Sequence, residues 1–252
     1  MYYSEEAAQK LNEDLLSIRA KYRDLLEKFV RHKFECSKAE EYATHGFGRR
    51  LRVMVRCIEN VFEQLPPDFS GIPDEDELID VTINLHAFIH STYGCCDNLA
   101  WIWVHERSIL HEDGSPPKPK DIGLRTNFLL GSMPQELKVY LDTKNEWYLR
   151  LKNYRDALSH RIPIYIPPHM VSSEFESEYL NLGKAADDAL KYGDIEQYYN
   201  LEKKQKEIVN FVPIFTHSFV EKSDLVFFHR QMVEGFNAVQ EISNKFLEEL
   251  VR

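Results

Sequence analysis

The stretch that decides the fold reads Leu85-His-Ala-Phe-Ile-His-Ser-Thr-Tyr-Gly-Cys-Cys-Asp-Asn-Leu-Ala-Trp-Ile-Trp-Val104. Its apolar side chains fall on most faces of a helix, and a helix that is apolar all round is buried. The four consecutive acidic residues 74–77 stand just before it. Carboxylates are favoured in the first turn of a helix by the backbone dipole. We therefore predict a central helix from residue 74 to about residue 104.

Two amphipathic helices are predicted on the N-terminal side of this central helix. Residues 4–42 carry a single apolar seam, and residues 47–65 repeat the helical period until Pro66-Pro67 stops it. The stretch Thr44-His-Gly-Phe-Gly48 separates them. We expect the chain to break there, so that the two helices pack as an antiparallel hairpin. The seam of the first helix is formed by Leu11, Leu15, Ile18, Tyr22, Leu25 and Phe29.

The C-terminal half alternates predicted helices with short β-rich pieces. A loop over 112–133 precedes a helix over 134–162, and another helix spans 225–251. Between them, 162–168 and 208–216 predict a small ribbon with two polar helices, 184–192 and 194–206, inserted in it. The predicted fold is mainly α, an up-and-down helical bundle in one domain over 1–252, with an inserted ribbon and short-helix excursion over 162–216.

Composition limits the function classes. The chain has 252 residues, and 41 acidic against 31 basic side chains give a net charge of −10. Such a balance argues against a surface that clamps duplex DNA throughout. Four cysteines without a Cys-x-x-Cys pair fit a reducing compartment. Neither a signal peptide nor a run of 18 apolar residues is present, so we expect a cytoplasmic protein without a membrane segment.

One basic residue does not fit its surroundings. On an ideal helix over 134–162, Arg155 falls inside the apolar stripe, 40° from Leu151 and 60° from Leu158, at about 100° per residue. A buried guanidinium needs a carboxylate, an interface or an anionic ligand. Asp97 on the central helix is one candidate partner. Lys144 shares the stripe and shows the alternative, in which a long basic side chain reaches out to water.

A histidine ends the same helix. His160 lies where exposed carbonyl groups favour an imidazolium, and Asp156, four residues earlier, can orient its ring. The alternative for this pair is an ordinary surface ion pair. Arg155 and His160 lie about 140° apart around an ideal helix. A single ligand that touches both therefore requires a distorted helix end or a second chain, and a homodimer with a composite cleft is the simpler solution.

The segment Arg155-Asp-Ala-Leu-Ser-His160 resembles the R-x4-6-H motif of the HEPN superfamily of helical nucleotide-binding domains. The longer stretch 153–168, together with Asp97-Asn-Leu-Ala-Trp101, is similar to a bacterial branch of that superfamily. The resemblance implies a HEPN-like helical bundle whose homodimer forms an endoribonuclease site that needs neither metal nor cofactor. In other members the module is non-catalytic and serves dimerisation or nucleotide binding, and toxin members have a neutralising antitoxin-type partner.

The resemblance assigns Arg155, His160 and Asp156 to catalysis, with Asp97 and Ser159 in supporting positions. A histidine can take the proton from a ribose 2′-hydroxyl, and an arginine can stabilise the charge on phosphorus. The basic window 144–161 adds Lys152 and Arg161 as predicted contacts to RNA. A second basic run is more simply explained as a solvated helix face. That run consists of Arg49, Arg50, Arg52 and Arg56.

A metal site is the third hypothesis. His86 and His90 are four residues apart on the central helix, with Cys95, Cys96 and Asp97 close by. No Glu-x-x-His pattern accompanies them, and the two histidines flank apolar residues. We expect core histidines bonded to the backbone and no metal.

Overall fold

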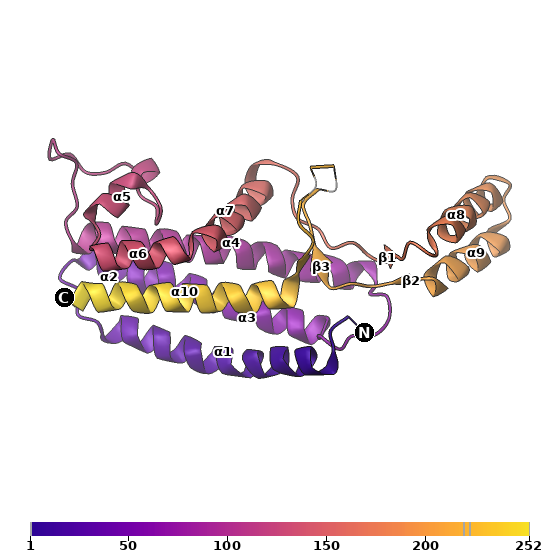
Figure 1. Ribbon diagram of the computed structural model, residues 1–252, viewed down its shortest axis with the longest axis horizontal. Helices are drawn as coiled ribbons and strands as arrows, with labels where there is room; N and C mark the ends of the chain where they lie inside the picture. The colour runs from indigo at the N-terminus through magenta and orange to yellow at the C-terminus, as the bar shows by residue number, and fades with distance from the viewer. Residues whose placement is uncertain (1, 219, 222, 252) are drawn as a thin grey trace.

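The computed structural model describes residues 2–218, 220–221 and 223–251 and shows a mainly helical protein with two small antiparallel sheets. Four long helices run side by side: α1 (Glu5–Arg31), α3 (Gly48–Gln64), α4 (Glu75–Glu106) and α10 (Phe228–Val251) (Figure 1). The helical bundle predicted from the sequence is therefore confirmed. In the described part of the chain, no helix has the length and apolarity that a membrane crossing requires.

The central helix is α4, as predicted. Its first turn carries a capping box, in which Asp74 accepts from the Glu77 amide and the Glu77 carboxylate accepts from the Asp74 amide. The helix packs against α3, α10 and α7 (Asn145–His160), so most of its faces are covered. That coverage explains why its sequence is apolar nearly all round.

The first helix ends eleven residues earlier than the sequence predicts, at residue 31 in place of residue 42. Helix α1 ends at Arg31, and the backbone at His32 is extended. The carboxylate of Glu106 on α4 accepts hydrogen bonds from the amides of Glu35 and Cys36, which stabilises this break. Residues 44–48 do not break the helix, because α2 (Ser37–Glu41) continues through the π-helix η1 (Tyr42–Phe47) into α3. The antiparallel packing of α1 and α3 is confirmed (Figure 1).

Two further predictions need correction. The helix expected over 134–162 is two helices, α6 (Gln135–Thr143) and α7, because the backbone at Lys144 leaves the helical range with ψ near 6°. Lys144 binds Glu241 on α10 at this joint. The loop expected over 112–133 contains the 3-10 turn η2 (Pro119–Asp121) and the helix α5 (Asn127–Ser132). Local capping by the Thr126 hydroxyl stabilises α5.

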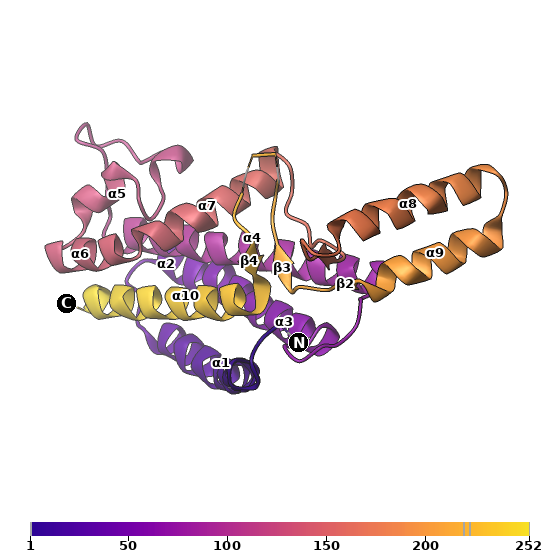
Figure 2. The same ribbon diagram turned by 45° about the vertical axis from the view of Figure 1, so that its right-hand side comes forward.

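The excursion before α10 forms an arm. Strand β1 (Met170–Val171) pairs with β2 (Val209–Asn210), and Tyr165 bridges Thr216. The predicted ribbon is therefore present, but its first strand lies after the predicted segment 162–168, which contributes only the single bridge at Tyr165. The helices α8 (Glu176–Lys191) and α9 (Ile195–Glu207) pack on each other and project from one end of the bundle (Figure 2). A second sheet joins β3 (Ile214–Phe215) to β4 (Val226–Phe227) directly before α10.

Candidate functional site

The sequence-predicted arginine lines a pocket between α3, α4 and α7. Its volume is about 370 Å³. Helix α7 leans across α4 at this place (Figure 1). The lining residues are Arg50, His90, Tyr93, Gly94, Asp97, Pro119, Ile122 and Arg155. Four of them come from one face of α4, because His90, Tyr93, Gly94 and Asp97 follow the spacing of a single helical stripe.

Arg155 is held by two groups of its own chain. Its guanidinium lies 4.2 Å from the centre of the Tyr93 ring and 3.1 Å from the Asp156 carboxylate. Burial alone lowers the pKa of Arg155, but Tyr93, Asp156 and Asp97 outweigh that effect and raise it, so the group stays charged. Its Nε–H is buried without a hydrogen-bond partner among the described residues. The guanidinium therefore keeps unused donor capacity.

Arg50 reaches the same pocket from α3. Its Nε donates to the Asn98 side chain at 3.1 Å, and its guanidinium lies against Gly94. A Cβ atom at Gly94 would stand 2.4 Å from the nearest guanidinium nitrogen, so only glycine leaves room for this approach. The sequence had suggested a solvated face for this arginine. Arg50 is exposed, as that interpretation expects, and its positive charge also borders the Arg155 pocket.

His90 and Asp97 are the titratable groups of the pocket besides the arginines and Tyr93. Partial burial lowers the pKa of His90, and His86, Arg155 and Arg50 lower it further, so its imidazole is neutral near pH 7. Burial raises the pKa of Asp97 to about 6, although Arg155 and Arg50 act in the opposite direction. The pocket thus combines a neutral imidazole with a carboxyl group that is partly protonated near neutral pH.

The other residues predicted around Arg155 lie elsewhere on α7. Asp156 binds Arg155, and no hydrogen bond or ion pair joins it to His160 among the described residues. His160 and Ser159 are exposed in the last turn and do not line the Arg155 pocket. Asp97, one candidate partner of Arg155, does line it, but no ion pair or hydrogen bond joins the two side chains among the described residues, and Arg155 pairs with Asp156. Within one chain, therefore, the structure brings Arg155 together with Asp97 and not with His160.

The two predicted RNA-binding residues are both accessible. Lys152 is exposed on α7, and Arg161 caps the end of that helix. The Arg161 guanidinium donates to the backbone and side-chain oxygens of Asn153. Arg161 also lines a second pocket, on the side of α7 next to β3 and β4.

No metal centre is formed by the described residues, among which no three metal-ligating side chains converge. The His86 ring bonds the Ile164 carbonyl oxygen at 2.9 Å, as expected for a histidine bonded to the backbone. His90 does not follow that expectation, because it lines the Arg155 pocket.

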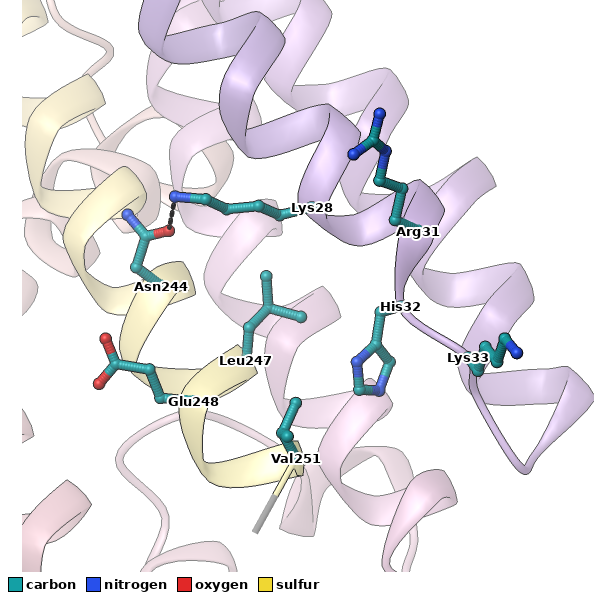
Figure 3. Close-up of a pocket in the computed structure, with 8 residues that line it drawn as sticks. All are labelled: Lys28, Arg31, His32, Lys33, Asn244, Leu247, Glu248 and Val251. Atoms are coloured by element: carbon teal, nitrogen blue, oxygen red, sulfur yellow. Dashed lines mark hydrogen bonds between the residues drawn. The ribbon is translucent and has the colours of Figure 1, made fainter.

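A larger cavity of about 1010 Å³ lies between the ends of α1 and α10 (Figure 3). Lys28 donates to Asn244 across it, and Lys28 and Arg31 also pair with Asp24 and Glu27 on α1. Their side chains are 46% and 79% exposed. The basic groups here are paired along one helix and solvated, so this cavity lacks the convergence seen around Arg155.

The sequence alone did not predict that four residues on one stripe of α4 line the same pocket. His90 and Asp97 were considered separately, Arg50 was assigned to solvent, and Tyr93 was not considered. The available signal was a row of polar side chains on a helix that is otherwise apolar, since buried polar groups require partners.

Comparison with protein-family models, with curated proteins and with solved structures gives no significant match to this chain. The function is therefore argued from the chain's own residues and contacts.

Proposed function

We propose that this protein is a metal-independent endoribonuclease of the HEPN type, and that the Arg155 pocket binds the scissile phosphate. One observation carries the proposal: guanidinium groups from two different helices, those of Arg50 and Arg155, border the same pocket as His90 and Asp97. Two guanidinium groups suit a phosphodiester because arginine presents several donors in a planar fork. The R-x4-6-H resemblance of Arg155 and His160 adds support from the sequence.

The side chains of the pocket can supply a general base and a general acid for RNA cleavage. The neutral imidazole of His90 takes the proton from the ribose 2′-hydroxyl, and the 2′-oxygen attacks phosphorus. The bond from phosphorus to the 5′-oxygen breaks, and protonated Asp97 supplies the proton for the leaving oxygen. The two arginines stabilise the added negative charge. The products are a 2′,3′-cyclic phosphate and a 5′-hydroxyl end.

His160 takes part, in this proposal, only through a second copy of the chain. It stands outside the pocket formed by its own Arg155. A homodimer with facing α7 ends would carry the partner's histidine toward the phosphate, as the HEPN resemblance implies. The proposal thus assigns the proton of the 2′-hydroxyl to His90 and a dimer-dependent contribution to His160.

The test compares variants on a short ribo-oligonucleotide and its deoxy counterpart, in the presence of a chelator. We expect wild type to cleave only the RNA and to leave cyclic phosphate ends. Arg155→Ala should slow cleavage by about 100-fold or more, since removing one charge-stabilising donor costs on that order. His90→Ala should cause a comparable loss. The control His45→Ala removes an exposed histidine that hydrogen-bonds Arg49 and does not line the Arg155 pocket.

Cleavage by wild type that Arg155→Ala and His90→Ala leave intact would contradict the proposed site. If His160→Ala abolishes cleavage while His90→Ala does not, the base comes from the second copy. Loss of activity on diluting the protein below its dimerisation range would then accompany that result.

A non-catalytic nucleotide-binding module is the second candidate. The observation in its favour is that Arg155 is already paired with Asp156 and Tyr93 within one chain. In that case RNA binds with a dependence on Arg155, and neither the ribo- nor the deoxy-oligonucleotide is cleaved.

A further inference from the structure

A second polar pocket lies on the other side of α7. It has a volume of about 320 Å³, within the range of sites for small molecules. Helix α7 and the residue that follows it supply one wall, and four described residues from between β3 and β4 supply the other. The lining residues are Arg150, Asn153, Tyr154, Arg161, His217, Glu221, Ser223 and Asp224.

His217 carries an unsatisfied polar atom in this pocket. Its side chain is only 4% exposed, and its Nδ1 is buried without a hydrogen-bond partner among the described residues. The nearest carboxylate oxygen, from Glu221, is 3.6 Å away, which is too far for a hydrogen bond. A buried polar atom without a partner costs free energy. A ligand that bonds this nitrogen would remove that cost.

The charges of the pocket are mixed in sign. Arg150 comes from α7 and Arg161 directly follows it, while Glu221 and Asp224 come from the opposite wall. Arg161 lies 3.9 Å from Glu221, so this pair is in contact without being closely bonded. A simple anion would meet two carboxylates here, and a simple cation would meet two guanidinium groups. The two arginines suit an anionic end of a ligand, and the two carboxylates suit an end that donates hydrogen bonds.

The Ser223 hydroxyl is fully used by the protein. It donates to the Ser218 carbonyl oxygen at 2.8 Å and accepts from the amides of His217 and Ser218. The Ser218 hydroxyl in turn accepts from the Glu221 amide at 3.1 Å. These bonds position the backbone at Glu221 and at Ser223, next to Asp224, and a binding site for a specific edge of a molecule requires positioned groups.

We propose that this pocket is a nucleotide subsite that prefers guanine. The arginines bind the phosphate, and a carboxylate accepts from the adjacent N–H groups on the Watson–Crick edge of guanine. His217 bonds the base through Nδ1, which lacks a hydrogen-bond partner among the described residues. The inference rests on the proposed function, because it makes this pocket the place where a nucleotide next to the scissile phosphate is held. Helix α7 supplies side chains to both pockets, Arg155 to one and Arg150 to the other.

The test measures binding of guanosine 5′-monophosphate to the full chain by calorimetry, with the adenosine and uridine nucleotides for comparison. We expect guanosine monophosphate to bind about tenfold more tightly than the others, the discrimination of a good bidentate contact. Glu221→Gln should remove that preference, and Arg161→Ala should weaken binding of all three nucleotides. The matched controls are Glu234→Gln and Arg230→Ala, which alter an exposed ion pair on α10.

Two results would overturn the subsite. One is equal binding of the three nucleotides, and the other is guanine preference that persists in Glu221→Gln. Failure of the proposed function looks different, because RNA is then not cleaved while the binding measurements stand on their own. The Arg155→Ala variant separates the pockets further, since it should slow cleavage by about 100-fold or more and leave the guanine preference unchanged.

Discussion

Burial and nearby positive charges act in opposite directions on the pKa of Asp97. Its carboxyl group is packed on α4 within the field of two guanidinium groups, yet burial wins and raises its pKa to about 6. The native protein therefore holds a proton on Asp97 at pH values where the unfolded chain has released it. Such a group lowers the free energy of unfolding above its native pKa, because the buried carboxylate is then charged.

Replacing the Asp97 carboxyl should show how much the charged form lowers the free energy of unfolding. We expect Asp97→Asn to be more stable than wild type at pH 7.5, by about 2 kcal/mol, and the difference to shrink as the pH falls toward 4. The sign follows because wild type loses stability as the pH rises from 4 through 6, whereas an amide does not titrate. Urea unfolding across this pH range measures it. Asp187→Asn, on an exposed part of α8, should show no such trend, and a parallel trend in both variants would refute the account.

At the scale of elements, α4 and α7 form the site jointly. The polar stripe of α4 supplies His90, Tyr93 and Asp97, and α7 places Arg155 over the Tyr93 ring. The Tyr148 hydroxyl on α7 donates to the Tyr93 hydroxyl at 3.3 Å, so the two helices are bonded at the same point. This contact orients the ring on which the guanidinium stacks.

A substitution at Gly94 should affect stability and RNA binding in opposite directions. Alanine is favoured over glycine inside a helix by about 1 kcal/mol. The added Cβ would meet the flexible end of Arg50, which can move aside. We expect Gly94→Ala to keep or raise the free energy of unfolding while it weakens RNA binding, because Arg50 leaves the pocket.

Chemical unfolding and RNA titration measure the two effects of this substitution. Gly131→Ala on α5 is the matched control, since a Cβ there meets nothing within 4 Å. It should leave RNA binding unchanged. Unchanged RNA binding in Gly94→Ala would show that Arg50 does not contribute to the site.

At the scale of the whole molecule, the arm stands apart from the bundle. Helices α8 and α9 bury only Ala186 and Ala189, and they meet the rest of the protein near β2 (Figure 2). Several large apolar side chains remain exposed on them. These are Leu180, Leu190, Tyr192, Ile195 and Tyr199. The arm therefore contributes little to the packing of the bundle core.

Removing the arm tests that independence. The strands β1 and β2 pair directly, so a short glycine-serine linker can replace residues 175–207. We expect the shortened chain to unfold cooperatively, with a free energy of unfolding within about 1 kcal/mol of wild type, as measured by urea unfolding. Loss of the cooperative transition would show that the arm contributes to the bundle core.

The sequence by itself determined the helical class and the central helix, and it singled out Arg155 as a basic residue on an apolar helical stripe. These follow from local rules, because hydrophobic periodicity and capping residues depend on neighbours along the chain. The capping box at Asp74 and the apolar run of α4 are examples. The resemblance of Arg155 and His160 to a HEPN motif also came from the sequence, and it stays a prediction.

Only the tertiary structure decided where the chain turns and what surrounds Arg155. The break after Arg31 depends on Glu106, about 70 residues away, and the joint at Lys144 depends on Glu241 on α10. The pocket depends on a guanidinium from α3 that fits against a glycine of α4. Such contacts join residues far apart in the chain. The helical period describes one element at a time, so it carries no information about contacts between distant elements.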